Sequence, residues 1–121
     1  MVNSAEVLEP QSVGGLAVET STGRPARVRL AGELDYGTAP RLRSALARLA
    51  GADCVVDCTD LTFIDSLGIG VLVRYAIASE DRHHRLVLCN LREGVRRTLE
   101  VSGVIDRFVV RSMLDRNRSA H

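Results

Sequence analysis

The sequence contains no lysine, because all 16 of its basic residues are arginine. This absence excludes mechanisms that need a lysine amine, such as a Schiff base or the lysine of a phosphate-binding loop. Tryptophan is also absent, and aromatic residues make up only 3% of the chain. Leu, Val, Ile and Ala must therefore build the core. The formal net charge of +1 gives no overall attraction to DNA, RNA or anionic lipid, so we expect no direct binding to nucleic acid.

Long apolar segments are missing as well. No window approaches the roughly 20 apolar residues that a membrane-spanning helix needs. The first residues, MVNSAEVLEPQS, have neither the basic start nor the apolar centre of a secretory signal. We therefore expect a cytoplasmic protein that does not contact the membrane.

The sequence has three cysteines, Cys54, Cys58 and Cys89. Their odd number and their position in apolar segments argue against a disulfide framework. No histidine lies at metal-ligand spacing from them, so we expect neither a metal site nor a cofactor. The favoured interpretation is three small buried residues in a reducing compartment; a redox-sensing pair is the alternative.

Alternation between strand and helix patterns predicts the fold class. Strands are expected at 15–19, 26–30, 54–58, 86–91 and 108–110, and helices at about 40–49, 67–78 and 93–101. The order ββαβαβαβ predicts an α/β fold with a mixed, mostly parallel sheet and an antiparallel N-terminal hairpin at its edge. The length of 121 residues suits a single domain over 1–121 with a core at about 14–110 and polar tails at both ends.

One junction in this pattern combines apolar and polar residues in an unusual way. The segment DLTFIDSLGIGVLV places Asp65 and Ser66 where a strand turns into an apolar helix, which we expect to be buried over much of its surface. Three interpretations compete. Ser66 is a helix N-cap, for which serine is a preferred residue; or it is a catalytic nucleophile; or it is modified by another protein.

Three features favour modification over simple capping. Gly68 and Gly70 in the first helical turn are poor helix formers, which indicates a close approach to the backbone by a partner or by a neighbouring strand. A helix N-terminus with free N–H groups can accept a phosphate. Acidic residues also occur in the loops expected nearby, where strand carboxyl ends meet; these are Glu33, Asp35, Asp60 and Asp65.

The catalytic interpretation lacks the necessary partners. The surroundings of Ser66 do not form the G-x-S-x-G motif of serine hydrolases. His83 and His84 follow the far end of the helix that Ser66 begins, on the order of 20 Å away. They cannot activate the hydroxyl, and we expect no enzyme.

Four segments together resemble the anti-sigma factor antagonists of the STAS domain family. They are GELDYGTAPRLRSAL, VVDCTDLTFIDSLGIGVLV, LVLCN and VRRTLEVSGV, and the resemblance covers roughly Gly14 to Val110. Members are small bacterial cytoplasmic proteins with a mixed sheet. In that family the last helix follows the final strand, whereas this chain ends soon after Met113 with a polar tail, so that helix is either short or lacking.

The resemblance implies a function. Ser66 would be phosphorylated by a partner that is both an anti-sigma factor and an ATP-dependent serine kinase, and a metal-dependent serine phosphatase would remove the phosphate. The partner-binding residues are expected to be Asp35, Asp65, Ser66, Leu67, Gly68 and Asn90. Two alternatives remain: a STAS subunit of a lipid-transport or stress-signalling complex that is not phosphorylated, and a small hydrolase with Ser66 as its nucleophile.

Overall fold

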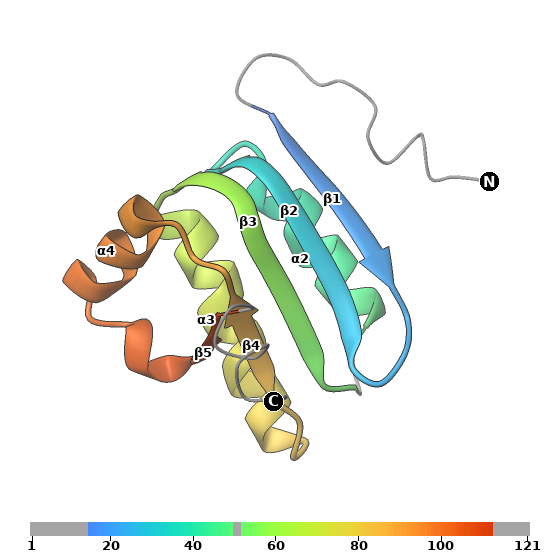
Figure 1. The fold of residues 1–121 in the computed structure, drawn as a ribbon. Coiled ribbons are helices and arrows are strands. Elements are labelled where there is room, and N and C mark those ends of the chain that lie inside the picture. The colour runs from blue at the N-terminus through green and yellow to red at the C-terminus, as the bar shows by residue number, and fades with distance from the viewer. Residues whose placement is uncertain (1–14, 50–51, 113–121) are drawn as a thin grey trace, which may run out of the picture.

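The computed structural model describes residues 15–49 and 52–112. An N-terminal hairpin is followed by alternating helices and strands, as Figure 1 shows. The elements are β1 (Leu16–Ser21), β2 (Ala26–Leu34), α2 (Ala39–Arg48), β3 (Cys54–Ile64), α3 (Ser66–Asp81), β4 (Leu86–Cys89), α4 (Glu93–Val101), the short 3-10 helix η1 (Ile105–Arg107) and β5 (Val109–Arg111). The position after β5 where a last helix was considered lies outside the described residues.

The five strands form one mixed sheet in the order β1-β2-β3-β4-β5. β1 pairs with β2 in antiparallel orientation, and the other neighbours are parallel. This confirms the predicted α/β fold with its antiparallel edge hairpin. The carboxyl ends of β2, β3 and β4 point the same way, so the loops that follow them are carried toward one rim of the sheet.

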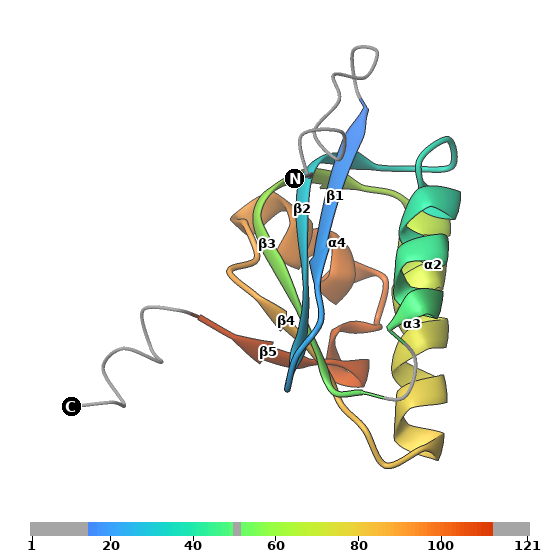
Figure 2. The same cartoon turned by 90° about the vertical axis from the view of Figure 1, so that its right-hand side faces the viewer.

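Helices α2 and α3 lie side by side on one face of the sheet (Figures 1 and 2). The apolar positions predicted to face inward from α2 are buried, namely Leu42, Ala45, Leu46 and Leu49. Helix α3 is less buried than predicted. Only the side that faces the sheet is covered, while Leu67 is 57% exposed and Ile77 38% exposed. No further layer of the described chain covers that outer side.

Strand β3 is much longer than its apolar core predicts. It runs to Ile64 and contains two register shifts against β2, between Arg29 and Ala31 and between Gly32 and Glu33. Each shift places an extra β3 residue opposite β2, as in a β-bulge. Strand β4 pairs only with the first part of β3, from Cys54 to Asp57. The rest of β3 therefore extends along the end of β2, beyond the reach of β4.

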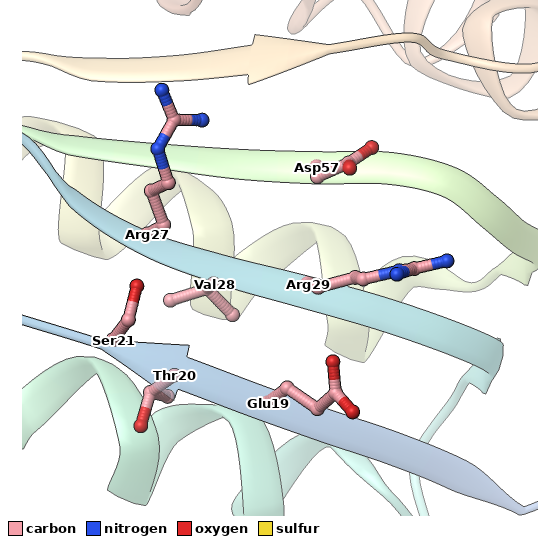
Figure 3. A pocket seen from close by; sticks show the side chains of 7 residues that line it. All are labelled: Glu19, Thr20, Ser21, Arg27, Val28, Arg29 and Asp57. Carbon is pink, nitrogen blue, oxygen red and sulfur yellow. The ribbon is translucent and has the colours of Figure 1, made fainter.

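The sheet face opposite α2 and α3 carries charged side chains in register. Glu19 on β1, Arg29 on β2 and Asp57 on β3 are aligned neighbours, as Figure 3 shows. Together with Arg27 they border an open hollow of about 400 Å³. The signs alternate across the strands, so neighbouring charges attract one another, although the ion pair of Arg29 is with Asp60. We interpret this face as a solvated sheet surface.

None of the three cysteines forms a disulfide bond, and all three are buried. Burial raises the pKa of Cys54 to about 11. It also raises the pKa of Cys58, with a smaller contribution from Cys89. Both thiols thus stay protonated at neutral pH, and a thiol reacts poorly in that form. The structure therefore agrees with the interpretation of the three cysteines as small buried residues.

Candidate functional site

The long strand β3 brings the start of α3 against the end of β2. The backbone N–H of Asp65 donates to the carbonyl oxygen of Leu34 at 3.1 Å. The next β2–α2 loop residue, Asp35, therefore lies close to Asp65 and Ser66. Residues far apart in the sequence meet here at one rim of the sheet.

Asp65, and not Ser66, is the N-cap of α3. Its Oδ1 accepts hydrogen bonds from the N–H groups of Leu67 and Gly68, both at 3.0 Å. Its Oδ2 accepts from the N–H of Tyr36 at 2.9 Å. Ser66 is the first residue of the helix and is exposed. The interpretation of Ser66 as a cap is therefore wrong, because the preceding carboxylate already fills that role.

The expectation of free N–H groups at this helix end also needs correction. Asp65 occupies the N–H groups of Leu67 and Gly68, and its carbonyl oxygen accepts from Ile69 at 2.9 Å. The N–H groups of Leu67 and Gly68 would otherwise be available for an anion, whereas the Ile69 bond is the first ordinary bond of the helix. A phosphoryl group on Ser66 could reach them only by displacing the Asp65 carboxylate.

Asp35 organises the loop that precedes α2. Its Oδ1 accepts from the N–H of Gly37 at 3.0 Å and from the N–H of Thr38 at 3.1 Å. The Thr38 hydroxyl accepts from the Asp35 N–H at 2.9 Å and donates to the Glu33 carbonyl at 2.8 Å. Asp35 thus fixes the loop that carries Tyr36 over the start of α3.

Three residues near Ser66 have exposed apolar side chains: Phe63 and Leu67 are close to it in the chain, and the Tyr36 N–H donates to the neighbouring Asp65. Tyr36 is 75% exposed, Phe63 48% and Leu67 57%. We call these three residues and Ser66 the Ser66 surface. Tyr36 and Phe63 were not predicted from the sequence, although they are two of only four aromatic residues in the chain. Solvent exposure of aromatic side chains around one polar group is typical of a protein-binding surface.

The two glycines of the first turn serve different purposes. Gly68 is buried, and a Cβ there would lie 2.6 Å from Leu34 Cγ and 2.8 Å from the Leu34 carbonyl oxygen. Close packing on β2 therefore explains Gly68. A Cβ at Gly70 would meet nothing within 4 Å.

The four acidic residues expected near Ser66 do not all gather there. Asp35 and Asp65 do, but Asp60 forms an ion pair with Arg29 at 2.9 Å. Arg92 Nη2 lies 4.0 Å from the other Asp60 oxygen. Asp60 therefore belongs to a charge network along β3.

Asn90 is also placed away from Ser66. Its amide donates to Thr59 Oγ1 at 3.1 Å and to Asp57 Oδ1 at 3.4 Å. Burial disfavours the Asp57 carboxylate, but hydrogen bonds from Thr59 and Asn90 outweigh it and hold its pKa below the usual value. The path along β3 from Asp57 to Asp65 is on the order of 20 Å. Asn90 follows the carboxyl end of β4, as predicted, but β3 runs on past β4, so Asn90 lies beside Thr59 and not beside Ser66.

Removing the Asp65 side chain should destabilise the protein far more than removing the Ser66 hydroxyl. Asp65→Ala loses an N-cap, which costs about 0.5–2 kcal/mol, and the hydrogen bond to Tyr36 N–H. We expect a loss of about 2 kcal/mol in the free energy of unfolding. Ser66→Ala is the matched control and should change it by less than about 0.5 kcal/mol. Urea unfolding measures both, and the reverse ranking would restore Ser66 as the cap.

Within residues 15–49 and 52–112, no group of three His, Cys, Asp or Glu side chains could hold a metal ion. His83 and His84 follow the C-terminal end of α3, where His84 Nδ1 lies 3.3 Å from Asp53 Oδ1. They are at the opposite end of the helix from Ser66. No helix in the described ranges is both long enough and apolar enough to cross a membrane.

Comparison with known proteins identifies the family. The sequence model of the STAS domain matches residues 17–117. The anti-sigma-B factor antagonist of Bacillus subtilis (strain 168) is 37% identical over 82 residues, which are 66% of this chain and 75% of that protein. The anti-sigma F factor antagonist of Paenibacillus polymyxa is 33% identical over 82 residues, covering 64% and 69% respectively.

Solved structures show the same fold. SpoIIAA in its unphosphorylated form, an anti-sigma factor antagonist, superposes with a TM-score of 0.66 at 25% identity, covering 85% of this chain and 97% of that one. The anti-sigma factor antagonist from Mycobacterium paratuberculosis gives a TM-score of 0.73 at 21% identity, with coverage of 87% and 92%. The murine anion transporter Slc26a9 shares the fold alone, at a TM-score of 0.62 and 19% identity over 90% of this chain and 18% of that one. The chain belongs to the STAS domain family, and its curated relatives are anti-sigma factor antagonists.

Proposed function

We propose that this protein is a cytoplasmic anti-sigma factor antagonist that works as a phosphorylation switch and has no enzymatic activity of its own. Unmodified, it binds an anti-sigma factor that is also a serine kinase, and the sigma factor is released. Phosphorylation of Ser66 ends the binding, and a serine phosphatase restores it. The names of the curated relatives support the class of partner, and the geometry at Ser66 supports the switch.

The exposure of Ser66 is the observation that carries the proposal. Its side chain stands at the tip of α3, on the described surface, and Asp65 performs the capping. The hydroxyl is thus available to a kinase without local unfolding. The nearby residues Tyr36, Phe63 and Leu67 have exposed apolar side chains, so a partner that docks on them would enclose the hydroxyl in its interface.

Electrostatics explains why phosphorylation would release the partner. A phosphoryl group adds about −1.5 to −2 charges at pH 7. The ion pairs of the described residues include neither Asp35 nor Asp65, so the new charge joins two carboxylates that no cationic side chain neutralises. Because Asp65 already occupies the N–H groups of Leu67 and Gly68, these two donors do not compensate the charge of the phosphate. A like-charge or desolvation cost of about 3 kcal/mol weakens binding roughly 100-fold.

The other predicted residues would contribute in different ways. Leu67 contacts the partner directly, with Tyr36 and Phe63. Asp35 and Asp65 hold the loop and the helix tip in place, and Gly68 sets the helix against β2. Asn90 contributes only at the margin of the interface. An interface of standard size buries about 800 Å² per partner, a patch roughly 30 Å across, which reaches from Ser66 to Asn90.

Phosphosite mapping tests the assignment. We expect incubation with the cognate anti-sigma factor and ATP to label Ser66 alone and Ser66→Ala to stay unlabelled, as read by tandem mass spectrometry. Ser79 is buried, and the hydroxyls of Thr59 and Thr62 are hydrogen-bonded to Asp57 and to the Gly32 carbonyl. Label on any of these three would refute the assignment to Ser66. Stable binding without label anywhere would favour an interaction module that is not phosphorylated.

A further inference from the structure

An apolar groove lies between the exposed sides of α2 and α3. It is lined by the buried Leu46 and by Ala47 from α2, and by Val71, Tyr75 and Ala78 from α3. We call it the α2–α3 groove. It runs along the side of α3, whereas the Ser66 surface lies at the tip of that helix. Ala78 is about 18 Å along the helix axis from Ser66.

The shape of the groove decides between two classes of occupant. Its volume is about 230 Å³, below the 300–1,000 Å³ typical of small-molecule and cofactor pockets. Its floor is held in place, because the Tyr75 hydroxyl donates to the Leu49 carbonyl at 3.2 Å. A small, preformed, apolar depression between two helices suits a few side chains of another helix.

The charges around the groove indicate which kind of helix fits. Arg43 from α2 and Arg74 from α3 complete its lining. Helix α2, APRLRSALAR, contains three arginines and no acid. The only acids of α3, Glu80 and Asp81, lie in its last turn. The groove therefore has an apolar floor and cationic sides that acidic side chains would complement.

We propose that the α2–α3 groove docks an acidic amphipathic helix of a partner protein. Apolar residues spaced three and four apart enter the groove, and flanking carboxylates pair with Arg43 and Arg74. A second copy of the chain is a poor fit, because no helix of the described residues combines an apolar side with mainly acidic residues beside it. In α4, EGVRRTLEV, two glutamates are accompanied by two arginines. The proposal does not depend on phosphorylation of Ser66.

A designed peptide provides the test. The probe is a capped 18-residue helical peptide with leucines at three- and four-residue spacing, glutamates beside them and alanines elsewhere; a second peptide has lysine in place of each glutamate. Calorimetry with the full chain should show at least tenfold tighter binding of the glutamate peptide. Amide chemical-shift changes should map to Ala47, Val71 and Ala78. The same result is expected for Ser66→Glu, which separates this proposal from the switch at Ser66.

Charge reversal sharpens the test. The double variant Arg43→Glu, Arg74→Glu should prefer the lysine peptide, while the control Arg97→Glu, Arg107→Glu, which changes exposed arginines of α4 and η1, should keep the original preference. Ala78→Glu, at an exposed helix position, should weaken binding of the glutamate peptide with an unchanged melting temperature.

Four results would overturn the proposal. The first is equal affinity for the two peptides. The second is that the amide chemical-shift changes are confined to the Ser66 surface or to the sheet face opposite α2 and α3. The third is concentration-dependent dimerisation that Ala78→Glu abolishes, which would assign the groove to a second copy. The fourth is that the glutamate peptide binds a Glu6→Arg, Glu9→Arg variant but does not bind the unaltered protein. This result would assign the groove to the chain's own acidic N-terminal segment.

Discussion

Ser66→Glu lowers the affinity for the cognate anti-sigma factor at least tenfold, and full phosphorylation of Ser66 lowers it about 100-fold. Glutamate adds one charge beside Asp35 and Asp65, whereas the phosphoryl group adds nearly two. A tenfold loss corresponds to about 1.4 kcal/mol, well within the cost of placing like charges together in an interface. Ser66→Ala should bind with nearly the affinity of the unmodified protein, because its hydroxyl takes no part in capping α3.

Isothermal titration calorimetry with the purified partner measures these effects. Thr20→Glu is the matched control, since it adds the same charge at an exposed position of β1, in the hairpin and away from the helix tip. It should leave the affinity within about twofold. If Thr20→Glu weakened binding as much as Ser66→Glu, total charge and not the Ser66 surface would determine recognition.

Gly68→Ala should destabilise the protein by about 2 kcal/mol, while Gly70→Ala should stabilise it by up to about 1 kcal/mol. The new methyl group at position 68 would lie 2.8 Å from the Leu34 carbonyl oxygen, a backbone atom that cannot move aside. Overpacking costs about 1–3 kcal/mol, and the close backbone contact places this variant at the upper end, where it exceeds the gain of about 1 kcal/mol in helix propensity. At Gly70 only the gain remains.

Urea denaturation of the two variants gives the comparison directly, because both exchange the same residues within one helical turn. Equal free energies of unfolding would show that Leu34 yields to the methyl group and that Gly68 is not required for packing. Gly68→Ala should also weaken partner binding, since it displaces the helix tip that carries Ser66.

The sequence predicts most of the fold because most segments follow one periodicity. Alternation of apolar and charged residues in ARVRL predicts a strand with one solvent-exposed face. The spacing of Leu42, Leu46 and Leu49 predicts the inward side of a helix. The length of β3 was missed, because its two bulges interrupt the alternation after Cys58. The same extension of β3 separates Asn90, which follows β4, from Ser66.

The details of the site depend on contacts between distant segments. Asp and Ser are both favoured N-caps, so the pair Asp65–Ser66 does not reveal which one caps the helix. In the structure the N–H of Tyr36, from another loop, donates to the Asp65 carboxylate and helps to hold it in the capping position. The exposure of Tyr36 and Phe63 likewise follows from where β2 and β3 end, and the sequence pattern around each aromatic residue is compatible with burial.

One measurement tests the central claim most directly. The protein is phosphorylated to completion at Ser66, and its dissociation constant for the cognate anti-sigma factor is compared with that of the same preparation after phosphatase treatment. We predict a weakening of about 100-fold that phosphatase treatment reverses in full, with the melting temperature nearly unchanged. Equal dissociation constants for the two forms would contradict the account.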